Sequence, residues 1–187
     1  MRSSVLGSVG EAVRILRAGG VVAYPTEACF GLGCDPRNTA AVRRILAMKK
    51  RSWDKGLILI SDRIERLLPY LMTRDQSLLD RMHCPQPGPV SWVCPASKTV
   101  PRLVRGAHHS IAVRITSHPP AAELCQGASM ALVSTSANIA GQVPLRSADR
   151  VARVFGDSVD LVVDAGIGRA ARPSTIIDAV SGEVLRS

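Results

Sequence analysis

The chain has few aromatic residues, two each of phenylalanine, tryptophan and tyrosine in 187 positions. Proteins that hold single-stranded nucleic acids commonly stack bases on aromatic side chains, and such a platform would be hard to assemble here. Long apolar runs are also missing, since no segment approaches the roughly 20 residues of a membrane-spanning helix. The first fifteen residues lack the basic-then-apolar order of a secretory signal. We therefore expect a soluble, cytoplasmic protein with no membrane contact.

The five cysteines form no Cys-x-x-Cys pair, and their odd number argues against a disulfide framework. We expect reduced thiols. His83, Cys84, Cys94 and His108 are conceivable zinc ligands, but their spacing fits no common zinc-binding pattern. Packing is the better explanation for these cysteines, and we expect no metal held by protein side chains.

The sequence contains neither a Walker A motif nor a complete Gly-x-Gly-x-x-Gly motif. A bound triphosphate would therefore need side-chain cations in place of the backbone amides of a glycine-rich loop. The formal net charge of +9 suggests an anionic partner such as a nucleotide, tRNA or pyrophosphate. A solvated basic surface explains the same charge, so composition alone leaves the function open.

The pattern of apolar residues indicates one α/β domain over residues 1–187, a twisted mixed sheet flanked by helices. Ser8 and Glu11 have the spacing of a capping box, and Asn38 is a second helix cap. The continuous apolar run 57–60 predicts a central strand buried on both faces, and Asp62 is expected to cap a helix that reaches residue 71. Further helices are predicted at 76–82, 120–125 and 148–155, and further strands at 21–24, 90–94, 111–115, 131–134 and 161–163, with a hairpin of 175–179 and 184–186.

Four polar clusters punctuate this pattern. The first, residues 24–35, passes from an apolar run through a Pro-Thr-Glu turn to two closely spaced glycines. Within it Glu27 is a possible general base, although a glutamate beside a turn is more often solvated or hydrogen-bonded to amides. Cys29 is expected to be a small packed residue and not a nucleophile.

The second cluster is basic and contains Lys49, Arg51 and Lys55. A helix dipole favours cations at a helix C-terminus without any ligand. However, this segment leads directly into the predicted central strand, and ligands of α/β sheets gather where strands meet loops. The position therefore favours an anion-binding role.

The third cluster places Arg114 in an apolar strand, where a guanidinium is expensive to bury without a partner. Its partner is either the carboxylate of a ligand or an internal Asp or Glu. Ser110 precedes it by four residues and shares its sheet face, because side chains alternate along a strand. In the fourth cluster, residues 134–138, hydroxyls and an amide follow a strand, where they either reach a phosphate or ribose or satisfy an ordinary turn.

The order Tyr-Pro-Thr-Glu, Lys-x-Arg, Pro-Gly-Pro, Ala-Val-Arg, Ser-Thr-Ser-Ala-Asn and Ser-Thr-Ile-Ile resembles the YrdC-like family of threonylcarbamoyl-AMP synthases over almost the whole chain. One departure is Ser52-Trp53, where the family usually has proline after Lys-x-Arg. The resemblance implies a YrdC-like fold with a concave basic cavity. It also implies synthesis of threonylcarbamoyl-AMP from L-threonine, bicarbonate and ATP with Mg²⁺, and release of pyrophosphate.

The same resemblance implies a downstream threonylcarbamoyl transferase complex that modifies tRNA position 37, and a possible tRNA contact. Its motifs assign roles to this chain: Lys49 and Arg51 as catalytic residues, Thr26, Arg114, Ser136 and Ser174 at threonine, and Lys49, Arg51, Lys55, Ser110, Asn138, Arg146 and Arg186 at the nucleotide. The alternative is a non-catalytic module that binds tRNA or rRNA on a basic concave surface.

Overall fold

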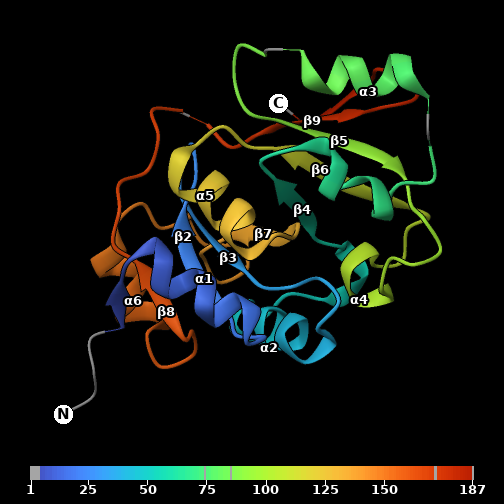
Figure 1. The fold of residues 1–187 in the computed structure, drawn as a ribbon. Coiled ribbons are helices and arrows are strands. Elements are labelled where there is room, and N and C mark those ends of the chain that lie inside the picture. The colour runs from blue at the N-terminus through green and yellow to red at the C-terminus, as the bar shows by residue number, and fades with distance from the viewer. Residues whose placement is uncertain (1–4, 74, 85, 171, 187) are drawn as a thin grey trace.

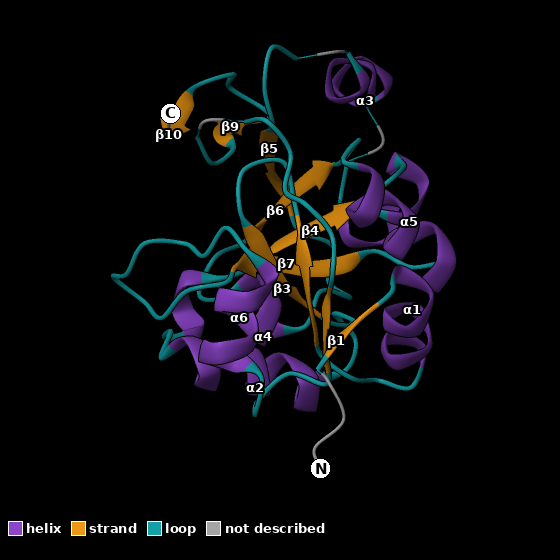
Figure 2. Ribbon diagram, turned by 90° about the vertical axis from the view of Figure 1, so that its left-hand side faces the viewer, coloured by secondary structure: helices purple, strands orange, loops and turns teal. Residues whose placement is uncertain are grey.

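A computed structural model describes residues 5–73, 75–84, 86–170 and 172–186. Within these ranges ten strands form one mixed sheet in the order β1-β8-β2-β3-β7-β4-β6-β5-β9-β10. Figure 1 labels the inner strands, and Figure 2 labels β1 and β10 at the two edges. Four neighbouring pairs are parallel (β1–β8, β8–β2, β4–β6 and β5–β9) and the others are antiparallel. The predicted α/β class and mixed sheet are confirmed. The strands are β1 Leu6–Gly7, β2 Val22–Pro25, β3 Phe30–Gly33, β4 Ile58–Ser61, β5 Val90–Pro95, β6 Ser110–Ile115, β7 Leu132–Ser136, β8 Leu161–Val163, β9 Thr175–Asp178 and β10 Val184–Arg186.

Helices cover both faces of this sheet (Figure 2). α1 (Val9–Arg17) and α5 (Pro119–Ala128) pack together on one face, and α2 (Thr39–Lys49), α4 (Arg102–Arg105) and α6 (Ala148–Phe155) lie on the other. α3 (Gln76–His83) lies beyond β5 and β9. The sheet is therefore the middle layer of three.

The helix starts follow from local capping. Ser8 accepts a hydrogen bond from the Glu11 amide, and the Glu11 carboxylate accepts one from the Ser8 amide, which completes the predicted capping box of α1. Asn38 Oδ1 accepts from the amides of Ala40 and Ala41 at the start of α2. α2 ends where Lys50 adopts a left-handed conformation with φ 50°, so the basic segment begins at a defined helix end.

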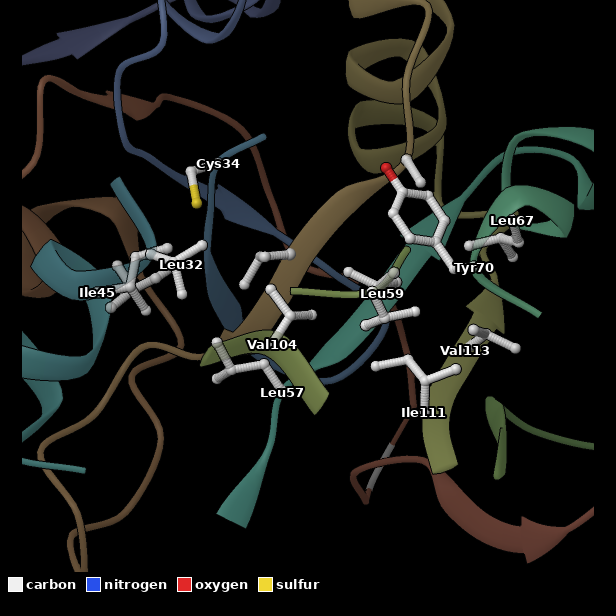
Figure 3. Close-up of a cluster of buried hydrophobic side chains, with 14 of the residues drawn as sticks. Leu32, Cys34, Ile45, Leu57, Leu59, Leu67, Tyr70, Val104, Ile111 and Val113 are labelled. Atoms are coloured by element: carbon white, nitrogen blue, oxygen red, sulfur yellow. The ribbon is translucent and has the colours of Figure 1, made fainter. Parts of the chain in front are cut away.

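The core confirms the central strand. β4 lies between β7 and β6, and its side chains alternate between the two helical layers. Leu59 is fully buried with Leu57, Ile111 and Val113 on the α2 side (Figure 3), while Ile60 is fully buried on the α1–α5 side. Both faces of β4 are thus apolar, which is why its sequence does not alternate.

The predicted helix from Asp62 to residue 71 is wrong. Two 3-10 turns, Ile64–Arg66 and Leu68–Tyr70, occupy this segment. Pro69 has no amide hydrogen to donate and disfavours a helical residue before it, so the chain turns tightly. The Asp62 carboxylate pairs with Arg63 and Arg66 and caps no helix.

The sequence prediction also missed β1, β3 and α4. β3 carries two glycines, which weaken a strand pattern. Gly33 is needed for close approach: a Cβ there would lie 2.8 Å from the Val133 carbonyl oxygen and 2.6 Å from the Tyr24 ring. The hairpin of β2 and β3 therefore depends on tertiary packing that composition does not reveal.

Candidate active site

A cavity of about 520 Å³ lies on the α1–α5 face of the sheet. Paired residues on neighbouring strands point to the same face, and side chains two apart share a face. Ile58 pairs with Ala112 and Ser134, and all three line the cavity. Two positions further along, Ile60 pairs with Leu132 and both are buried against α1 and α5. The cavity thus occupies the part of this face that the helices leave uncovered, where β4 and β6 begin and β7 ends.

The wall of the cavity is strongly cationic. Its basic side chains come from the loop after α2, the segment before β6, β6 itself and the C-terminal strand. Among the residues that the structure describes, no Asp or Glu lines it. The cavity suits a ligand with several negative charges. Its cations are Arg51, Lys55, Arg105, Arg114 and Arg186.

The basic loop after α2 is held by backbone contacts with the α4 segment. The Leu57 amide donates to the Val104 carbonyl at 2.8 Å, and the Ala107 amide donates to the Asp54 carbonyl at 3.0 Å. Arg51 Nη2 donates to the Gly56 carbonyl at 2.9 Å, while its Nε is buried without a hydrogen-bond partner in the described residues. The guanidinium is thus fixed at one end and retains a free donor.

Lys49 lies behind the cavity wall. Only 2% of the residue is exposed. Its Nζ donates to the carbonyl of Ser136, and to the carbonyl and Oδ1 of Asn138 at 2.9 and 3.1 Å. Burial of the ammonium, together with the neighbouring charge of Arg51, lowers the pKa of Lys49 to about 8. The ammonium fastens the end of β7, whose Ser136 faces the cavity.

Arg114 is 8% exposed and lines the cavity. Its Nη2 lies 3.2 Å from Oε2 of Glu27, and Oε1 of Glu27 accepts a 2.7 Å hydrogen bond from the Thr116 hydroxyl. The partner is thus an internal glutamate, which is one of the two alternatives that the sequence left open. Because the Glu27 carboxylate contacts two protein groups, it is disfavoured as a general base.

The cavity unites eight of the eleven site residues predicted from the sequence. Lys49 and Asn138 lie one layer behind it, and Arg146 is exposed on the loop before α6, outside the wall. The roles of all eleven residues stay predictions. The eight are Thr26, Arg51, Lys55, Ser110, Arg114, Ser136, Ser174 and Arg186.

Sequence reasoning missed Arg105 and His108, which also line the cavity. The sequence offered His108 only as a conceivable zinc ligand, and Arg105 belongs to the unpredicted α4. No local signal marks them, since the Asp54–Ala107 and Leu57–Val104 contacts that bring them to the basic loop are long-range. Cys29 lines the cavity as well, but burial raises the pKa of its thiol, which disfavours a thiolate nucleophile.

Residues 14–187 match the model of the Sua5/YciO/YrdC family, which carries the description "Telomere recombination". The chain belongs to the Sua5/YciO/YrdC family. It is 50% identical to a threonylcarbamoyl-AMP synthase of Thiobacillus denitrificans over 172 residues, which cover 92% of this chain and 91% of the relative. It is 45% identical to the threonylcarbamoyl-AMP synthase of Coxiella burnetii strain RSA 493, with 96% of each chain covered.

Solved structures of the Sua5/YciO/YrdC family share the fold. The P. abyssi Sua5 structure, complexed with L-threonine, matches with a TM-score of 0.84 and 32% identity over 91% of this chain. The chain spans 50% of that protein's length. E. coli YciO matches with a TM-score of 0.80 and 25% identity over 95% of this chain and 87% of its own. The longest α-helix in the described ranges, α2, has 11 residues, so a membrane-spanning helix is absent from these ranges.

Proposed function

We propose that this chain is a threonylcarbamoyl-AMP synthase, which joins L-threonine, bicarbonate and ATP and releases pyrophosphate. Relatives of that name are 45–50% identical to it over more than nine-tenths of its length. The observation that carries the proposal is the single cavity in which separate clusters of the sequence converge, with five cations and no lining carboxylate in the described residues. The product supplies the threonylcarbamoyl group that a downstream transferase complex moves to tRNA position 37.

The cavity answers the electrostatic problem of this reaction. A carbamate, a carboxylate and a triphosphate repel one another, so fixed cations directed at the developing charge are the main catalytic contribution. Alignment of the reactants adds to it, since well-oriented partners gain on the order of 7 kcal/mol over free encounter. Both effects require cations that are held in place before the substrates arrive, as Arg51 is through Gly56.

The basic end of the cavity is the proposed phosphate site. Arg51, Lys55 and Arg105 surround it, and Ser110 begins β6 beside them. Lys49 adds its charge from behind the wall and fixes Ser136 and Asn138. Arg186 from β10 and Arg146 from the loop before α6 complete the proposed nucleotide contacts.

The Arg114 end is the proposed threonine site. Arg114 offers the guanidinium for the substrate carboxylate, and Thr26, Ser136 and Ser174 offer hydroxyls. Ser174 is itself ordered by a 2.8 Å hydrogen bond with Ser91 and by Arg186, which donates to its carbonyl at 3.0 Å. The P. abyssi relative with bound L-threonine supports a threonine site on this fold.

The chemistry proceeds in two steps. The threonine amine attacks the carbon of bicarbonate, and a carbamate forms with loss of water. A carbamate oxygen then attacks the α-phosphorus of ATP, a new P–O bond forms, and the bond to the pyrophosphate oxygen breaks. Arg51, Lys55 and Lys49 stabilise the charge that moves onto the departing pyrophosphate, while Arg114 keeps the threonine carboxylate away from it.

The family resemblance also implies Mg²⁺ as a cofactor of the reaction. No described group of three or more His, Cys, Asp or Glu residues is arranged as a metal site, and no described carboxylate lines the cavity. Mg²⁺ typically takes one or two protein carboxylates together with substrate phosphates and water. The described side chains therefore do not form a magnesium site of the protein's own.

Pyrophosphate release, measured with threonine, bicarbonate and ATP each omitted in turn, tests the proposed function. Release should require all three substrates and should be lost in the Arg51→Ala variant. A non-catalytic RNA-binding module would instead show no release and an RNA affinity that falls steeply with salt. Release that is independent of threonine would refute the proposal.

A further inference from the structure

The two ends of the cavity differ in how their charge is balanced. Arg114 is paired with Glu27 at 3.2 Å, and both side chains are largely buried, at 10% and 17% exposure. Arg51, Lys55 and Arg105 form no ion pair within 4 Å with a described Asp or Glu. The basic end therefore keeps an excess of positive charge even with the Asp54 carboxylate near Arg51 and Lys55. At the other end the charge of Arg114 itself is balanced by Glu27, and Arg186 reaches this end by donating to the Ser174 carbonyl.

The charge balance at each end decides whether that end favours a phosphate group or an amino acid. A buried arginine fork without a counter-ion is a strong site for phosphate, because it donates two parallel hydrogen bonds to a dianion. ATP and pyrophosphate carry such groups and enter the same cavity. The Glu27 carboxylate beside the Arg114 guanidinium repels a phosphate dianion at short range. A zwitterionic amino acid, in contrast, adds no net charge to this end.

From this arrangement we propose that Glu27 determines the specificity of the Arg114 end, making it accept the amino acid and reject phosphate groups. This inference rests on the proposed function and deepens it, because it names the residue that keeps the two anionic substrates in separate places. Glu27 acts through Arg114, so it is a positioning residue.

The surroundings of Glu27 fit this task because they fix the carboxylate without using the oxygen that faces Arg114. The Thr116 hydroxyl donates to Oε1, while Oε2 forms only the ion pair with Arg114 and accepts no hydrogen bond from the described residues. The backbone is fixed as well: the Ala170 amide donates to the Glu27 carbonyl at 3.0 Å, and the Gly168 amide donates to the Thr26 carbonyl at 2.9 Å. A change of the side chain alone therefore leaves the turn in place.

The test compares Glu27→Gln, which removes the charge but keeps the shape, with Thr116→Val, which removes the hydrogen bond but keeps the charge. Steady-state pyrophosphate release is measured against threonine and against ATP, with inorganic phosphate as the inhibitor. In Glu27→Gln we expect the KM for threonine to rise about tenfold because phosphate groups of ATP then compete for Arg114, while the KM for ATP stays within about twofold. Inorganic phosphate should become competitive with threonine at about tenfold lower concentration than in the parent. In Thr116→Val the KM for threonine should rise without any gain in phosphate inhibition.

A rise in the threonine KM of Glu27→Gln without the gain in phosphate inhibition would overturn the proposal, because a purely structural role predicts that result. Unchanged kinetics would overturn it equally. Calorimetric titration with inorganic phosphate keeps the question separate from turnover: Glu27→Gln should bind phosphate more tightly than the parent, and a Glu27→Gln/Arg114→Gln double variant should lose the gain. If the parent shows no threonine-dependent release, the proposed function fails, while this titration still decides the phosphate specificity.

Discussion

Replacing Lys49 by Met should remove most of the activity without destabilising the protein. Methionine keeps the length of the aliphatic chain but removes the ammonium, so the packing of this 2% exposed residue is largely retained. In the parent, burial and Arg51 lower the pKa of Lys49 from 10.5 to about 8, which means that the charged form costs folding roughly 3 kcal/mol at pH 7. That cost disappears in the variant.

The variant also loses hydrogen bonds, but most acceptors keep a partner. The Ser136 carbonyl still accepts from the Asn138 amide at 3.0 Å, and Asn138 Oδ1 still accepts from the Ser136 hydroxyl at 2.6 Å. Among the described residues, only the Asn138 carbonyl loses its hydrogen-bond donor, the Lys49 ammonium. This loss lowers the free energy of unfolding by about 1 to 3 kcal/mol. The gain from removing the buried charge and the loss of the hydrogen bond nearly cancel. We therefore expect Lys49→Met to be as stable as the parent or up to about 2 kcal/mol more stable, with a melting temperature up to about 8 °C higher.

Thermal melts and pyrophosphate release, measured together from pH 7 to 10, check this reasoning. The sign follows from linkage: because the folded pKa lies below the unfolded one, the parent gains stability as pH rises from about 8 towards 10.5, and the advantage of Lys49→Met should shrink over that range. Turnover should fall at least about 100-fold at pH 7, and the difference from the parent should narrow above pH 8, where Lys49 of the parent loses its proton. Lys50→Met is the matched control, since Lys50 is exposed at the same helix end. A melting temperature more than about 6 °C below the parent, or near-normal turnover, would refute the reasoning.

Two further predictions concern the same cavity. In the parent, kcat/KM for ATP should fall above pH 8 as Lys49 loses its proton, whereas the fall in kcat should lie at higher pH because bound triphosphate favours the charged form; a flat rate profile from pH 7 to 10 would contradict this. Arg51→Lys keeps the charge but loses the planar fork that donates to Gly56, so we expect pyrophosphate release to fall at least about tenfold with little change in melting temperature, and parental rates would show that charge alone suffices.

Local sequence explains much of the framework. The capping box of Ser8 and Glu11, the Asn38 cap and the apolar run of β4 each depend on neighbours within a few residues, and the structure confirms all three. The failure at residues 62–71 has a local cause too, since Pro69 is incompatible with the helix that Asp62 was expected to cap. The alternation of Ser110 and Arg114 on one face of β6 also followed from strand geometry alone.

The sequence by itself determined the strands β4, β6 and β7 at the site and the set of polar clusters able to bind anions, but not β3 or α4. Tertiary structure decided which partners these clusters meet. Glu27 reaches Thr116 across 89 positions, and Lys49 reaches Ser136 across 87. Such pairings depend on strand order and on the region that α1 and α5 leave uncovered, and both arise from packing of the whole chain. For that reason the sequence predicted Arg114 as a buried cation, but only the folded chain shows that Glu27 balances it.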